Sequence, residues 1–99
     1  MRKHALVVHP DRETRILLER WLHSEGYLPQ SVRHGSDAVL LAKHATLDLI
    51  VLDRKAPHTE CSDVILGLMT DPKSATIPIA FANGNSKDLP ILATSRTVH

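Results

Sequence analysis

The chain has 99 residues, a formal net charge of +1, and Lys and Arg scattered along its length. It is therefore one small domain, and it lacks the basic stripe that is typical of nucleic-acid-binding proteins. The single cysteine, Cys61, excludes an intramolecular disulfide and fits a reducing compartment. No apolar run approaches the roughly 18 residues that span a membrane. The apolar run that begins at Ala5 is too short for a signal-peptide core. We therefore predict a single cytoplasmic domain over residues 1–99, with no membrane contact.

A short apolar strand and an amphipathic helix open the chain. His4 to Val8 is a continuous apolar run, typical of a strand buried on both faces. Asp11 is the expected N-cap of a helix that runs to about Ser24, and Gly26 is its expected stop. Apolar residues recur along this helix at helical spacing and predict a buried face formed by Leu17, Leu18, Trp21 and Leu22.

A weak strand and a second helix follow. The strand, Tyr27 to Val32, contains Pro29, and proline cannot donate to a strand ladder. We therefore place it at an edge of the sheet. The helix begins at Gly35 and reaches Lys43, and its predicted inner side consists of Ala38, Leu41 and Ala42.

The third strand, Leu47 to Asp53, is the most apolar and is predicted to be central. A third helix, capped by Ser62 or Asp63, runs to about Thr70 and ends before Pro72. Its predicted buried face consists of Val64, Ile65, Leu68 and Met69.

A fourth strand is predicted over Ile77 to Ala82, and a short helix over Lys87 to Ala93. The alternation of strands and helices indicates a parallel sheet with helices on both faces. In such sheets ligands bind beyond the carboxyl ends of the strands. His9, Asp53 and Asn83 follow three of these ends, so we expect them to converge on one crevice.

The segment from Asp48 to Pro57, DLIVLDRKAP, resembles the strand, aspartate and loop proline of response-regulator receiver domains. The helix from Cys61 to the Asp-Pro pair, and Ile77-Pro78-Ile79, are similar to later parts of that family. The resemblance implies an α/β, flavodoxin-like, doubly wound parallel sheet with strand order 2-1-3-4. The family's fifth strand, with its Lys-Pro pair, and its last helix have no counterpart here. We therefore expect them to be missing, unless Ile91 to Val98 supplies a replacement.

The same resemblance places Asp53 at the family's phosphoacceptor aspartate. His9 and Pro10 stand where the family has two adjacent acids that hold Mg²⁺, and Asn83 stands at the position of a Ser or Thr hydroxyl. Mg²⁺ prefers carboxylate and water oxygens, and phosphoryl transfer depends on neutralising charge. We therefore expect a degenerate receiver that is not an enzyme, has no catalytic residue and needs no cofactor.

Two alternatives stay open at these positions. Asp53 can still accept a phosphoryl group if Asp11 takes the missing metal position beside His9, and Mg²⁺ would then be required. Alternatively, His9, Asp53 and His58 are ligand types that suit Zn²⁺, and they would form a metal-sensing or pH-sensing module.

The expected partners are proteins. Without a fifth strand, strand four would be an open edge, and the first helix would lose its neighbour. We therefore expect a homodimer or a heterocomplex with a histidine kinase or an output protein, formed through strand four or by exchange of the C-terminal segment. The predicted function is that of a pseudo-receiver in a two-component or phosphorelay-type pathway, which acts by protein–protein interaction and binds no nucleic acid.

Overall fold

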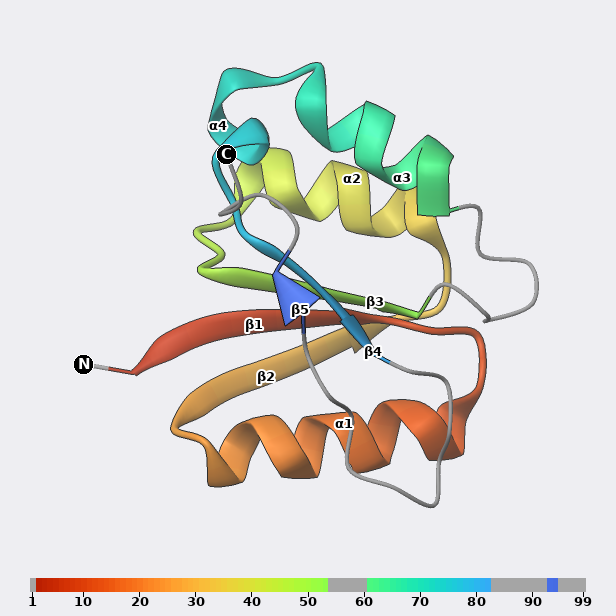
Figure 1. Ribbon diagram of the computed structural model, residues 1–99, viewed down its shortest axis with the longest axis vertical. Helices are drawn as coiled ribbons and strands as arrows, with labels where there is room; N and C mark the ends of the chain where they lie inside the picture. The colour runs from red at the N-terminus through yellow and green to blue at the C-terminus, as the bar shows by residue number, and fades with distance from the viewer. Residues whose placement is uncertain (1, 54–60, 83–92, 95–99) are drawn as a thin grey trace.

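The structure, a computed structural model, describes residues 2–53, 61–82 and 93–94, and in this part a sheet lies between two layers of helices (Figure 1). Helix α1 covers one face of the sheet, and helices α2, α3 and α4 lie on the other. The strands are β1 (Lys3–Val8), β2 (Tyr27–Val32), β3 (Leu49–Asp53), β4 (Ile79–Ala82) and β5 (Ala93–Thr94). The helices are α1 (Arg12–Ser24), α2 (Gly35–His44), α3 (Cys61–Met69) and α4 (Pro72–Ala75).

The sheet has the order β2-β1-β3-β4-β5, and its first four strands are parallel. This confirms the predicted order 2-1-3-4, the central place of β3 and the edge position of β2. The chain moves outward from β1 to β2 and then returns to β3 on the other side of β1. The order therefore reverses between β1 and β3, where an open α/β sheet forms its crevice.

Pro29 explains why β2 lies at the edge. The carbonyl of Val32 accepts a hydrogen bond from the amide of His9 at 3.1 Å, so the backbone polar groups of Val32 face β1. Because successive residues of a strand direct these groups to opposite sides, those of Tyr27, Pro29 and Ser31 face away from β1. The missing N–H of Pro29 thus falls on the side where no ladder bond is required.

Strand β5 lies within Ile91 to Val98, the segment expected to supply a substitute if the fifth strand is replaced, so β4 is not an open edge. It pairs antiparallel with β4 through Ala80↔Thr94 and Phe81↔Ala93. A short antiparallel strand therefore covers the edge of β4. Its pairing satisfies backbone donors and acceptors of β4 that would otherwise form an open row. Ala93 lies in this strand and not in the predicted helix that begins at Lys87, and the rest of that helix lies outside the described residues.

The core consists of two apolar clusters, one on each face of the sheet, because successive strand residues point to opposite faces. The larger cluster lies beneath α2 and α3, and its main strand and helix residues are Leu6, Val8, Ala38, Ala42, Ile50, Leu52, Val64, Leu68, Ile79 and Phe81. The smaller cluster lies beneath α1 and consists of Ala5, Val7, Leu18, Leu22, Leu49, Val51, Ala80 and Ala82.

Two helix faces differ from the prediction. Leu17 is 44% exposed and Met69 is 59% exposed, although both were expected in the core. Each directly precedes or follows a buried leucine, and neighbouring helix residues lie about 100° apart around the axis, so only one of the two can face the sheet. Trp21 is half-buried against the smaller cluster.

The region around α3 also departs from the prediction. Helix α3 already includes Cys61, so neither Ser62 nor Asp63 is its N-cap. After α3 the chain forms the additional short helix α4, whose N-cap is Asp71 with Pro72 at its first position. Over residues 2–53 and 61–82, no helix is long and apolar enough to cross a membrane.

Candidate functional site at the carboxyl ends of β1 and β3

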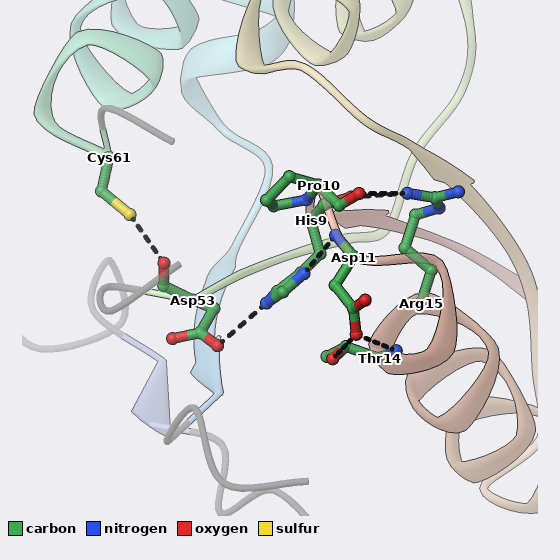
Figure 2. A network of polar contacts seen from close by, with 7 residues as sticks. All are labelled: His9, Pro10, Asp11, Thr14, Arg15, Asp53 and Cys61. Carbon is green, nitrogen blue, oxygen red and sulfur yellow. Dashed lines mark hydrogen bonds and ion pairs between the residues drawn. The ribbon is translucent and has the colours of Figure 1, made fainter. Parts of the chain in front are cut away.

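His9 and Asp53 meet at the carboxyl ends of β1 and β3 (Figure 2). The parallel register pairs Val8 with Leu52, so the next residue on each strand falls at the same level. The Nε2 atom of His9 lies 3.3 Å from Oδ2 of Asp53, and the two side chains are only 7% and 3% exposed. The predicted convergence of these two residues is therefore correct. Asn83, the third residue expected there, lies outside the described residues.

The backbone determines which nitrogen of His9 carries the proton. The amide of Asp11 donates a hydrogen bond to Nδ1 of His9 at 2.9 Å. A nitrogen that accepts a hydrogen bond carries no proton, and a neutral imidazole has one N–H. The proton of His9 is therefore on Nε2, the nitrogen that lies 3.3 Å from Oδ2 of Asp53.

Asp11 serves as the N-cap of α1, as predicted from the sequence. Its Oδ2 atom accepts hydrogen bonds from the Thr14 hydroxyl at 2.6 Å and from the Thr14 amide at 3.0 Å. These two bonds, the hydroxyl first, hold the pKa of Asp11 below its usual value of 3.8. Figure 2 shows the carboxylate beside Thr14, while the imidazole of His9 points toward Asp53. In this geometry Asp11 does not occupy a metal position next to Asp53.

Two further residues hold the site in place, and the sequence analysis assigned neither of them this role. Arg15 donates through Nη1 to the carbonyls of His9 and Pro10, each at 3.0 Å. The thiol of Cys61 donates to the carbonyl of Asp53 at 3.4 Å. The sequence signal for the first contact is an arginine near the start of a helix, six and five residues after the carbonyls of His9 and Pro10. The second contact joins the start of α3 to the end of β3.

The donor set does not fit a magnesium ion. Mg²⁺ requires several oxygen ligands, whereas Pro10 has no side-chain donor and His9 presents an N–H. The geometry of His9 also disagrees with a zinc site, because a metal-bound histidine donates its second nitrogen's proton to a neighbour, and here Nδ1 accepts one. Within the described ranges, no group of three or more His, Cys, Asp and Glu side chains could hold a metal ion. His58, the third residue of the zinc alternative, lies outside those ranges.

Several solved structures with the same fold are receiver domains. The chemotaxis response regulator CheY4 of Vibrio cholerae superimposes with a TM-score of 0.74 and 18% identity, over 88% of this chain and 74% of that one. A CheY-like receiver domain from Methylobacillus flagellatus gives 0.75 and 21%, over 92% and 77%. The receiver domain of a sensor histidine kinase from Pseudomonas aeruginosa, with magnesium coordinated in its active-site cleft, gives 0.76 and 22%, over 87% and 70%.

These similarities establish the fold of the chain: it is the CheY-like, flavodoxin-like fold of response-regulator receiver domains. The resemblance found in the sequence is thereby confirmed at the level of fold. No protein-family model matches the sequence, and a search of curated proteins gives no significant match.

Proposed function

We propose that this chain is a pseudo-receiver, a receiver-fold module of two-component or phosphorelay-type signalling that binds other proteins and does not depend on phosphorylation of Asp53. The observation that carries the proposal is the buried contact between Nε2 of His9 and Oδ2 of Asp53. This contact lies at the position where a receiver domain would hold its metal ion.

The chemistry of phosphoryl transfer supports this assignment. Transfer to a carboxylate brings two negatively charged groups together, and catalysis consists mainly of positioning them and neutralising their charge. Among the described residues, the imidazole of His9 faces Asp53, and it is neutral because Nδ1 accepts the Asp11 amide. The contact at 3.3 Å gives the carboxylate a polar neighbour in its resting state, but a neutral imidazole supplies no positive charge for an incoming phosphoryl group.

The proposed partners are proteins: a histidine kinase, an output protein or a second copy of the chain in the cytoplasm. Large apolar side chains remain exposed on both helical layers of the described structure, namely Ile16, Leu17, Leu40, Leu66 and Met69. Such side chains are common at protein interfaces when they gather into patches. No enzymatic activity and no nucleic-acid binding are proposed.

The experiment that tests the proposal is intact-mass spectrometry after incubation with acetyl phosphate and Mg²⁺. The wild-type protein is expected to show no phosphoryl adduct, and Asp53→Asn serves as the matched control. Circular dichroism of both proteins checks that they are folded. An adduct on the wild type that is absent from Asp53→Asn would contradict the proposal and support the alternative of a phosphoryl-accepting regulator.

Sedimentation velocity over a range of concentrations tests for a second copy as partner. A homodimer is expected to show a sedimentation coefficient that rises with concentration. A constant monomer value would contradict self-association and leave a different protein as the proposed partner.

A further inference from the structure

We infer that His9 is a built-in replacement for a cation: its imidazole is locked as the Nε2–H tautomer and thereby closes Asp53 to divalent metal ions. The inference deepens the proposed function, because it names what takes the place of the metal. Its biological meaning rests on that proposal, whereas its physical basis is the geometry of the turn between β1 and α1.

The first step is the lock on the tautomer. Nδ1 of His9 accepts the Asp11 amide at 2.9 Å. Moving the imidazole proton to Nδ1 would place two N–H groups against each other. It would also leave the carboxylate of Asp53 facing a nitrogen lone pair, since Nε2 lies 3.3 Å from Oδ2. Both changes are unfavourable, so the two contacts select the same tautomer.

The second step is the rigidity of the turn that carries the Asp11 amide. Arg15 donates to the carbonyls of His9 and Pro10. Asp11 is bound through its own carboxylate to Thr14 in the first turn of α1. The ring of Pro10 fixes its own φ angle. The amide that holds Nδ1 is therefore tied to the helix and cannot withdraw without breaking several of these contacts.

The third step is the consequence for a metal ion. A metal ligand must offer a lone pair, but the lone pair of His9 is used by the Asp11 amide and its N–H faces Asp53. A cation that approached Asp53 would have to displace this N–H from a contact whose two side chains are almost fully buried. His9 thus excludes hard cations and transition-metal ions by the same geometry.

The tautomer can be measured directly on the wild-type protein. Long-range ¹H–¹⁵N NMR spectra of the histidine rings distinguish the Nε2–H form, the Nδ1–H form and the imidazolium. His9 is assigned by the signal that disappears in His9→Gln. The expected result at pH 7 is the Nε2–H form, and either of the other two forms would overturn the inference.

Metal exclusion is tested with Mn²⁺, followed by calorimetry and by paramagnetic broadening of the Asp53 amide signal. The wild type is expected to show no Asp53-dependent binding. Folded His9→Asp is expected to gain binding, because two facing carboxylates attract a cation, and the gain should vanish in His9→Asp/Asp53→Asn. Binding by the wild type that Asp53→Asn removes, or no gain in folded His9→Asp, would overturn the inference.

A second variant covers the case in which His9→Asp does not fold. His9→Asn keeps an oxygen that can accept the Asp11 amide but has no donor at the Nε2 position. It is expected to bind Mn²⁺ more tightly than the wild type, and equal binding would count against the inference. Failure of the proposed function has a separate signature, since it appears as a phosphoryl adduct on Asp53 and not as a change in tautomer.

Discussion

His9 and Asp53 extend the parallel register of β1 and β3 by one step beyond Val8 and Leu52, and their side chains meet at 3.3 Å between Nε2 and Oδ2. A buried carboxylate requires polar partners, and His9, which directly follows the neighbouring strand β1, supplies one of them. The contact therefore joins the two strands at the point where the strand order reverses, and it has measurable consequences for stability.

Removing the imidazole donor should destabilise the fold. His9→Ala leaves the buried carboxylate of Asp53 without this partner, and the expected loss in free energy of unfolding is about 1–3 kcal/mol. His9→Gln retains an amide N–H of similar reach and should lose clearly less. Urea denaturation at pH 7 measures both. Equal losses for the two variants would mean that His9 contributes only its volume.

Helices α2 and α3 should not tolerate a side chain at Gly35. A Cβ on Gly35 would overlap Cγ2 of Val64, which is buried between the helices. Gly35→Ala is therefore expected to lower the free energy of unfolding by about 1–3 kcal/mol, the usual cost of overpacking. The double variant Gly35→Ala/Val64→Ala should lose less free energy of unfolding than the sum of the losses in the two single variants. The reason is that the second substitution makes room for the first.

Gly26 provides the control for that experiment, because this position requires glycine for its backbone conformation and not for lack of space. Its φ angle is +93°, and no atom lies within 4 Å of a Cβ built there. Gly26→Ala should cost about 1 kcal/mol through backbone strain alone. Substituting Val64 should leave this loss unchanged, and a change would contradict the separation of the two causes.

Pro29 should limit association along the outer edge of β2. Its missing N–H lies on the side facing away from β1, where no strand pairs among the described residues. Pro29→Thr introduces a donor there and should increase self-association, which size-exclusion chromatography at rising concentration would detect. Ser31→Thr, on the same edge, already has its N–H and should behave like the wild type. Identical elution of all three proteins would refute the role assigned to Pro29.

The N-cap at Asp11 should make the free energy of unfolding depend on pH in the acid range. Because folding lowers the pKa of Asp11 below 3.8, the ionised cap stabilises the fold fully above that pH. The contribution is lost as the pH falls through the lowered value. Thr14→Ala removes the largest cause of the shift, so the pKa of Asp11 should rise, whereas Thr14→Ser should keep it low.

Carboxyl ¹³C NMR titration measures this pKa in the three proteins. The stability difference between the wild type and Thr14→Ala is also expected to shrink once both carboxyls are protonated in strong acid. An unchanged Asp11 pKa in Thr14→Ala would show that the hydroxyl is not the main cause.

Much of this architecture could be predicted from local patterns. The continuous apolar run of β1, the Asp11 cap and the proline in β2 are properties of short segments, and they placed these elements correctly. The exposure of Met69 could not be predicted in this way. An apolar residue at the margin of a helical face is buried only if a neighbouring element covers it, and in α3 none of the described elements does so sufficiently.

By itself, the sequence determined that His9 and Asp53 lie at the same end of a parallel sheet, because each follows an apolar strand and parallel strands end at the same edge. Only the tertiary structure decided what the two residues do to each other. The proton position on His9 depends on where the Asp11 amide points, and Arg15 and Thr14 hold the turn that aims it. Such contacts depend on the three-dimensional path of a turn, which residue spacing alone does not specify.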